Sequence, residues 1–338
     1  MDSKRKPITK CDRQSGNIPY YGATGIQDYV KDYIFDGRYL LVGEDGAKWG
    51  KNDNTAYIIE GKSWVNNHAH ILKMHDDAID AYVRYFLNGK DLNCYITGAI
   101  VQKLTQAALV NIPIPLPPLE TQSRIVAELD LLQAIIDKQK AQLAELDNLA
   151  QCIFYDMFGD PVDNDKGWEV KKLGEVCEII AGGDKPEEIS NIKTKDYCYP
   201  VIANGDGDKG ILGYCRTKRV SCDAVTIGAR GASIGNCRIV SGGFTPVVRL
   251  IVLMPNESVN CTYLFFFAKQ MPYYSNGAGQ AQLTVPNVRD VSFILPPLSL
   301  QQTFAAKIES IEKQKAAISQ SIAETQKLFN FTMDKYFG

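Results

Sequence analysis

Two long segments of the chain carry apolar residues at alternating spacings of three and four positions. In the first segment these residues are Ile125, Leu129, Leu132, Ile136, Leu143, Leu146, Ala150, Ile153 and Met157. In the second they are Phe304, Ile308, Ile311, Ile318, Ile322, Phe329 and Tyr336. This spacing, kept over about four heptads, is typical of a coiled-coil seam. Neither segment contains Pro or Gly before its end, so each is predicted to form one helix of roughly 35–40 residues, about 55 Å long at 1.5 Å per residue.

A narrow apolar seam on so long a helix needs a partner, because a globular domain cannot cover a rod that extends beyond it. The two helices of this chain can cover each other most simply as an antiparallel pair. The residues predicted to pair are Leu129, Leu132, Ile136 and Leu143 with Ile308, Ile311, Ile318 and Ile322. Gln139 and Lys315 interrupt the seams near their middles. Each either fixes the register of the pair or marks a locally uncovered position.

The rest of the chain has the pattern of short β-strands. Apolar and β-branched runs at 39–42, 56–59, 225–227 and 247–253 are separated by Gly, Asn and Asp. Short helices are predicted at 78–88 and 262–270. The predicted class is α+β, with two β-rich domains in tandem, each followed by a long α-helix, and the two helices paired as an antiparallel coiled coil.

An internal repeat relates the two halves of the chain. Residues 104–119 (LTQAALVNIPIPLPPL) resemble residues 283–298 (LTVPNVRDVSFILPPL), 179 positions later. The same offset places Gln122 on Gln301 and Phe158 on Phe337. We therefore predict a first domain at 1–116 with its helix at 117–160, and a second domain at 161–295 with its helix at 296–338.

The two copies differ at their beginnings. The second opens with residues 168–180, which have the pattern of a β-strand, whereas the first has only 18 residues before Pro19 and no counterpart of that strand. Either the first domain is truncated at its N-terminal side, or another segment supplies the strand.

These features resemble the specificity subunit of type I restriction–modification systems. The resemblance rests on the duplication, on the junctions PIPLPPLETQ and LPPLSLQQ, and on the Phe-Gly ends of both helices, and it covers nearly the whole chain. Segments 22–30 and 39–47 are also similar to target-recognition domains of that family. The resemblance implies that each domain recognises one half of a split site in double-stranded DNA. It also implies that the helices set the spacing and dock methyltransferase subunits, two in number, which can recruit restriction (translocase) subunits.

Charge limits where DNA can bind. The formal net charge is −2, which excludes a globally basic protein that wraps nucleic acid; the helical segments carry −5 and +1, and the remainder carries +2. Local clusters must then supply contacts, Lys and Arg to phosphates and Gln or Asn to adenine edges. The candidates are Tyr20, Tyr21, Lys48, Lys51, Asn66, His68, Gln102, Lys103, Lys209, Lys218, Arg219, Arg230, Gln280, Gln282 and Asn287. For each of them a plain solvated surface position stays an open alternative.

No motif in the chain indicates catalysis or a cofactor. It lacks N-P-P-Y, G-x-S-x-G, P-loop and H-E-x-x-H sequences, and the G-x-G-x-x-G at 205–210 fits a turn shared by both repeats. His68 and His70 are placed on one face of a strand, but no further ligands stand at metal-site spacing. The nine cysteines form no C-x-x-C pair, and no apolar run suggests a signal or membrane span. We therefore expect a non-catalytic, cytoplasmic protein without a membrane partner. The resemblance implies that a partner subunit transfers the methyl group from S-adenosylmethionine to adenine.

Three other interpretations remain open at this point. The chain is a self-sufficient methyltransferase or nuclease, a coiled-coil scaffold whose β domains bind protein or sugar, or a truncated, recombination-swapped specificity cassette that needs a second chain.

Overall fold

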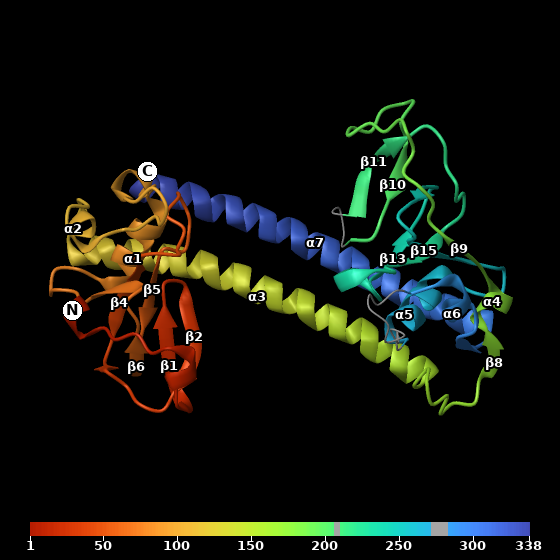
Figure 1. The fold of residues 1–338 in the computed structure, drawn as a ribbon, viewed down its shortest axis with the longest axis horizontal. Coiled ribbons are helices and arrows are strands. Elements are labelled where there is room, and N and C mark those ends of the chain that lie inside the picture. The colour runs from red at the N-terminus through yellow and green to blue at the C-terminus, as the bar shows by residue number, and fades with distance from the viewer. Residues whose placement is uncertain (206–209, 272–282) are drawn as a thin grey trace. The chain divides into compact units, whose positions relative to one another are not determined.

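The computed structural model describes residues 1–205, 210–271 and 283–338 (Figure 1). The chain divides into two compact units. Unit 1 comprises Met1–Ala141 and Ile318–Gly338, and unit 2 comprises Gln142–Ala317. Each unit contains one β-rich domain and a part of each long helix, which confirms the predicted α+β class with tandem domains.

Two small sheets form the domain of unit 1. The first sheet contains β1 (Ser15–Gly22), β2 (Gly25–Val30), β3 (Phe35–Asp36) and β6 (Lys62–Val65), in the order β2-β1-β6-β3. The second contains β4 (Tyr39–Gly43), β5 (Ala56–Ile59) and β7 (Ala69–Leu72), in the order β5-β4-β7. Two helices follow, α1 (Asp80–Gly89) and α2 (Gln106–Leu109). Short 3-10 turns lie at Asp2–Lys4, Lys10–Asp12 and Asn93–Tyr95.

The domain of unit 2 contains two sheets similar to these and one further pair of strands. One sheet has the order β11-β10-β14, from β10 (Tyr199–Ile202), β11 (Ile211–Cys215) and β14 (Thr245–Pro246). Another has the order β13-β12-β15-β9, from β9 (Cys177–Ala181), β12 (Ala224–Ile227), β13 (Cys237–Val240) and β15 (Ile251–Pro255). A third pairs β8 (Glu169–Lys172) with β16 (Ser292–Leu295), and the helices are α4 (Leu173–Val176), α5 (Cys261–Gln270) and α6 (Val285–Arg289), with a 3-10 turn at Gly231–Ser233.

Equivalent strands pair in the same way in the two domains. The central strand β4 is antiparallel to β5 and β7, and its counterpart β12 is antiparallel to β13 and β15. Likewise, β1 runs parallel to β6 and β10 runs parallel to β14. The repeat seen in the sequence is therefore a repeat of topology.

Two predicted strands of unit 2 have different bounds from those expected. The segment 168–180 is interrupted by the helical turn α4, which divides it into β8 and β9. The predicted strand at 247–253 begins only at Ile251, because Val248 and Arg249 have φ values of +54° and +57°. A left-handed backbone cannot continue a β-ladder.

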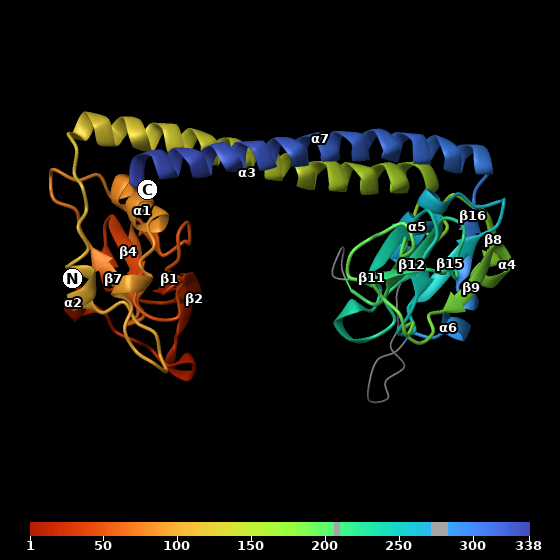
Figure 2. The same cartoon turned by 90° about the horizontal axis from the view of Figure 1, so that it is seen from above.

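The long helices α3 (Leu119–Phe158) and α7 (Leu298–Phe337) pack antiparallel within each unit (Figure 2). In unit 1 the Tyr336 hydroxyl donates to Glu128 Oε2 at 2.7 Å, and Gln139 Nε2 donates to Ser321 Oγ at 2.7 Å. Residues nearer the C-terminus of α3 therefore contact residues nearer the N-terminus of α7, as expected for an antiparallel pair. In unit 2, Lys315 Nζ lies 2.8 Å from Asp147 Oδ1.

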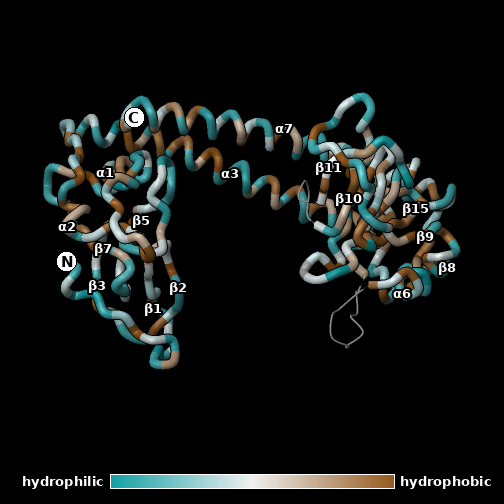
Figure 3. The backbone as a smooth tube through the Cα atoms, turned by 45° about the horizontal axis from the view of Figure 1, so that its top comes forward, coloured by the Kyte–Doolittle hydropathy of each residue, from teal (hydrophilic) through white to brown (hydrophobic). Residues whose placement is uncertain are grey.

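Burial along the two helices follows the predicted spacing, and hydrophobic residues recur along both helices (Figure 3). Of the residues predicted to pair, Leu129, Leu132, Ile136, Ile308 and Ile311 are buried, and Leu143, Ile318 and Ile322 are half-buried. The two polar interruptions have separate partners, since Gln139 bonds Ser321 and Lys315 bridges Asp147 and Glu312.

The C-terminal end of each long helix enters the core of one unit. Phe158 at the end of α3 packs against Tyr263 of α5 in unit 2, with ring centroids 4.6 Å apart. Phe337 at the end of α7 packs against Tyr82 of α1 in unit 1, with centroids 5.4 Å apart. The recurrence of Phe-Gly in the sequence thus marks two equivalent core anchors.

A buried glutamine joins each long helix to the short helix beside it. Gln122 accepts from the Ile79 backbone N–H at 2.9 Å and donates to the carbonyl of Asp77. Gln301 accepts from the Asn260 N–H at 2.8 Å and donates to the carbonyl of Pro296. Both side chains are fully buried, so their hydrogen bonds are required to avoid unpaired polar groups in the core.

Candidate nucleic-acid interface

A closed loop at residues 97–103 projects from the domain of unit 1. Thr97 and Lys103 exchange backbone hydrogen bonds of 2.9 and 2.8 Å at its base. Beyond this bridge Gln102 is exposed, and Ile100 at the tip is 98% exposed. The loop can therefore reach into a groove of a duplex, with an amide for a base edge and an apolar tip for a thymine methyl group.

A charged cluster fixes the base of this 97–103 loop. Lys103 Nζ lies 3.0 Å from Asp45 Oδ2, and the other oxygen of Asp45 bonds Nδ1 of His68. Burial opposes the charge on Asp45, but the hydrogen bonds from Lys103 and His68 outweigh it and lower the pKa of this carboxyl. The same contact raises the pKa of Lys103. Two of the predicted DNA contacts, His68 and Lys103, are thus brought together, and both keep exposed surface.

The structure corrects two predicted contacts of unit 1. The Tyr20 side chain is buried, its hydroxyl accepts from the Ile8 N–H at 3.1 Å, and the Arg13 guanidinium covers its ring. Asn66 is also buried and accepts from the His68 N–H at 2.8 Å. Neither side chain can reach a duplex from these positions; both support the residues around them.

The remaining candidates of unit 1 lie at or near its surface. Tyr21 is half-buried beside Tyr57, with ring centroids 6.0 Å apart. Lys48 is exposed, and Lys51 is exposed in an ion pair with Asp334 of α7 at 2.8 Å. Both lysines are available to DNA phosphates. Lys51 would have to leave its ion pair with Asp334 to contact a phosphate.

In unit 2 the described candidates are exposed side chains on several segments. Lys218 lies over the Tyr199 ring at 5.5 Å, and Arg219 follows it. Arg230 follows the end of β12, and Asn287 on α6 accepts a hydrogen bond from the Thr284 hydroxyl. Lys209, Gln280 and Gln282 lie outside the described residues.

Arg249 is a further exposed cation that the sequence pattern did not single out. Asn204 donates to the Val248 carbonyl at 2.7 Å and accepts from the Ala229 N–H at 2.8 Å. One asparagine therefore holds the segments that carry Arg249 and Arg230. The connection between β14 and β15 is also the counterpart of the β6–β7 connection that carries His68. Aligning the repeats through this connection could have identified Arg249, but the β-branched run around it suggested a strand instead.

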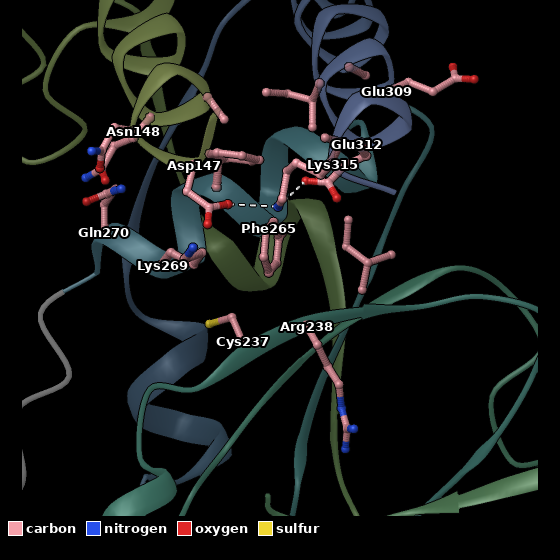
Figure 4. Close-up of a pocket in the computed structure, with 17 residues that line it drawn as sticks. Asp147, Asn148, Cys237, Arg238, Phe265, Lys269, Gln270, Glu309, Glu312 and Lys315 are labelled. Carbon is pink, nitrogen blue, oxygen red and sulfur yellow. Dashed lines mark hydrogen bonds and ion pairs between the residues drawn. The ribbon is translucent and has the colours of Figure 1, made fainter. Parts of the chain in front are cut away.

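Unit 2 also contains a cavity of about 570 Å³ beneath the helical pair (Figure 4). Its apolar wall includes Phe265 and Ile308. At its rim the Lys315 ammonium lies 2.8 Å from both Asp147 Oδ1 and Glu312 Oε1. Burial opposes the charge on Lys315, but these two carboxylates raise its pKa. The cavity combines apolar side chains with an ion-paired cluster of Lys315, Asp147 and Glu312.

The repeat accounts for part of this cavity. Ala150 lines it, and the residue 179 positions later is Phe329, whose ring packs 6.2 Å from that of Tyr85 in unit 1. A methyl group in unit 2 therefore stands where unit 1 has an aromatic ring.

The described residues contain neither a metal cluster nor a membrane-spanning helix. No group of three or more His, Cys, Asp or Glu side chains there is arranged to hold a metal ion. His70 lies within β7 and His68 directly precedes that strand, and their rings bond different carboxylates, Asp2 for His70 and Asp45 for His68. No helix in the same part of the chain combines the length and apolar character needed to cross a membrane.

Comparison with known proteins identifies the family. Residues 1–148 and 165–326 match the model of the type I restriction modification DNA specificity domain. A type I specificity subunit of Mycoplasma pneumoniae is 27% identical over 316 residues, covering 90% of this chain and 84% of that protein. A type I restriction enzyme specificity subunit of Haemophilus influenzae is 39% identical over 135 residues, covering 40% of this chain and 35% of that protein.

A solved structure shares the fold over the whole chain. The S subunit of a type I restriction–modification system from M. genitalium superimposes with a TM-score of 0.64 at 14% identity, covering 100% of this chain and 94% of that one. At this identity the likeness supports the fold, and the family model supports membership. Together they favour a specificity subunit over the self-sufficient methyltransferase or nuclease considered above. The chain therefore belongs to the type I restriction–modification DNA specificity subunits, a family whose members are non-catalytic.

Proposed function

We propose that this chain recognises a split DNA sequence, one half with the domain of unit 1 and the other half with the domain of unit 2. The observation that carries this proposal is the duplicated topology, since the central strands of each unit pair in the same way and carry different surface residues. Equivalent scaffolds with different exposed side chains are suited to binding two different short sequences in the same geometry.

DNA binding is proposed to depend on local contacts. The helical segments are acidic or nearly neutral, and the domains carry only a small positive balance. In unit 1 the contacts are assigned to Lys48, Lys51, His68 and the 97–103 loop. In unit 2 they are assigned to Lys218, Arg219, Arg230, Arg249 and Asn287. A limited set of phosphate contacts predicts a moderate salt dependence, because each neutralised phosphate contributes about 0.9 to the slope of log K against log salt.

The long helices are proposed to dock methyltransferase subunits. In unit 1 both helices expose large apolar side chains, Leu131, Ile135, Leu328 and Phe331, at 63, 38, 51 and 67%. Because Gln139 meets Ser321, these residues lie at a similar level of the antiparallel pair. Such a surface is suited to a partner that buries apolar area. We propose two methyltransferase subunits for each chain, which can recruit restriction subunits, and a cytoplasmic setting with access to the chromosome.

Mapping of methylated adenines tests the proposal. Cells with and without this chain, in the presence of its methyltransferase subunit, are compared across the genome. The expected result is one bipartite motif that is methylated only when the chain is present. Absence of any sequence-dependent methylation, together with no DNA mobility shift at low salt, would refute it and favour a scaffold.

One observation favours a second candidate, a cassette that needs another chain. In unit 1 no strand corresponds to β8 or β9 of unit 2 within the described residues. If unit 1 does not recognise DNA, two chains would each contribute unit 2, and the methylated motif would be a palindrome of identical half-sites. An asymmetric motif would exclude this alternative.

A further inference from the structure

His70 is a buried residue with an acceptor at each ring nitrogen. Its side chain is 1% exposed. Nδ1 lies 2.5 Å from Asp2 Oδ2, and Nε2 lies 2.6 Å from the Leu104 carbonyl oxygen. A neutral imidazole carries a proton on only one nitrogen. Both contacts are hydrogen bonds only when the ring is the doubly protonated, positively charged form.

The ring joins three segments that are far apart in the sequence. Asp2 belongs to the N-terminal turn, His70 to β7, and Leu104 directly follows the 97–103 loop. The Leu104 N–H also donates to the Glu44 carbonyl at 2.8 Å, so the residue after the loop is held through both of its backbone polar groups.

The same N-terminal segment covers the edge of the sheet that differs between the units. In unit 2 the edge of β15 is paired with β9. In unit 1 the corresponding edge of β7 is met by side chains. The Ile71 N–H donates to Asp2 Oδ1 at 2.9 Å, and Arg5 Nη1 donates to the Ala69 carbonyl at 2.9 Å. Side chains thus satisfy backbone groups that a strand satisfies in the other repeat.

We propose that His70 is a positioning residue for DNA recognition by unit 1: it clamps the base of the 97–103 loop, through Leu104, to the edge of β7 and to Asp2. This inference rests on the proposed function. The clamp fixes the direction in which Gln102 and the loop tip project. Without this clamp, the buried Leu104 carbonyl loses its hydrogen-bond partner. The loop then becomes ordered only when DNA binds, and the entropy lost in ordering it weakens binding.

The charge of the ring determines which bond is lost first. The charged groups around it are Asp2, Glu44 at 3.8 Å, Arg5 bonded to Glu44, and Lys103 at 4.0 Å from Glu44. Burial opposes the charge, but the hydrogen bonds with Asp2 and Leu104 raise the pKa of His70. When the ring loses a proton, the remaining one stays with the carboxylate, the stronger acceptor, and the Leu104 bond breaks.

The test uses the complete chain assembled with its methyltransferase subunits. His70→Gln is compared with His75→Gln, the same change at an exposed histidine outside the candidate interface. Methylation rates are measured on DNA panels with single base substitutions in either half of the site. For His70→Gln we expect discrimination in the half recognised by unit 1 to fall about tenfold, with the other half unchanged. His75→Gln should match the wild type.

Base discrimination by the wild-type complex is also measured as a function of pH. This second measurement does not depend on whether the His70→Gln variant folds. Discrimination in the unit 1 half should decline as pH rises through the raised pKa of His70, while the other half serves as an internal control. The inference would be overturned if His70→Gln discriminated between bases as well as the wild type does in both halves of the site. It would also be overturned if the variant lost the same factor of discrimination in both halves. If the wild-type complex itself shows no sequence preference, the result contradicts the proposed function of the chain, which is a different outcome from a failure of the role assigned to His70.

Discussion

The two Phe-Gly ends of the long helices provide a direct test of how the chain is assembled. Phe158 is fully buried and contacts the rings of Tyr263, Phe304 and Phe154, with centroids 4.6, 5.3 and 5.3 Å away. Phe337 is 4% exposed and contacts the rings of α1, those of Tyr82 and Phe86, at 5.4 and 6.0 Å. Replacing either residue by Ala should destabilise one unit and spare the other.

The magnitude follows from this packing. Removing a buried Phe side chain costs about 3–5 kcal/mol, and each aromatic pair contributes about 0.5–1.5 kcal/mol beyond burial. Phe158→Ala should lie at the upper end of this range, because the Phe158 side chain is fully buried and its three ring neighbours lie 4.6–5.3 Å away, whereas those of Phe337 lie 5.4–6.4 Å away. In units of this size, each kcal/mol lowers the unfolding midpoint by about 2–4 °C. We therefore expect a decrease of roughly 10–15 °C for Phe158→Ala and several degrees less for Phe337→Ala.

Hydrogen exchange read by mass spectrometry resolves the two units. Phe158→Ala should accelerate exchange in peptides of α5, and Phe337→Ala should accelerate exchange in peptides of α1. Leu149→Ala and Leu328→Ala are matched controls on the same helices, because these side chains are 47% and 51% exposed. Equal loss of protection in α1 and α5 for either variant would refute the assignment of one helix end to each core.

Four other predictions follow from the structure. Ile136→Asp places a charge in the fully buried part of the α3–α7 seam, and we expect it to separate the helices there, with lost exchange protection; unchanged thermal stability would contradict the pairing. Ala150→Phe copies Phe329 of the other repeat and should fill the cavity, raising the unfolding midpoint of unit 2 by an amount equivalent to about 1 kcal/mol; a lower midpoint would show that the ring does not fit. The raised folded-state pKa of His70 contributes stability that is complete below its unfolded pKa of about 6.5 and is lost as pH rises through the folded pKa; urea unfolding of unit 1 at several pH values should show this decline, and His70→Gln should remove it. Lys48→Ala should weaken DNA binding on all sequences alike and reduce the salt slope by about 1 if this lysine contacts a phosphate; a change in sequence preference would assign it to a base.

Several elements could be predicted from the sequence because they depend on local periodicity. The 3,4 spacing predicted both long helices, and the repeat predicted that two similar domains precede them; both are confirmed. The short helices were also predicted close to the bounds of α1 and α5. In contrast, the segment 168–180 was predicted as one strand. The turn α4 breaks it because the Leu173 and Val176 side chains are buried in the core of unit 2, which local pattern does not reveal.

The candidate interface was only partly predictable. Gln102, His68 and Lys103 were named from residue type and lie on or beside one loop. Tyr20 and Asn66 were named on the same grounds, yet their side chains are buried. Residue type indicates which bonds a side chain can make, but which side of a strand faces solvent depends on the sheet against which it packs.

The sequence by itself determined the secondary structure of the helical pair and the duplication, because both follow from spacing within one continuous segment. Only the tertiary structure decided that Gln122 and Gln301 anchor the helices and that Asp2 and Arg5 cover the edge of β7. It also placed His70 between a carboxylate and the base of a loop. These contacts join residues 34 to 69 positions apart, and chain closure over such distances is set by how the strands pair, which no local pattern encodes.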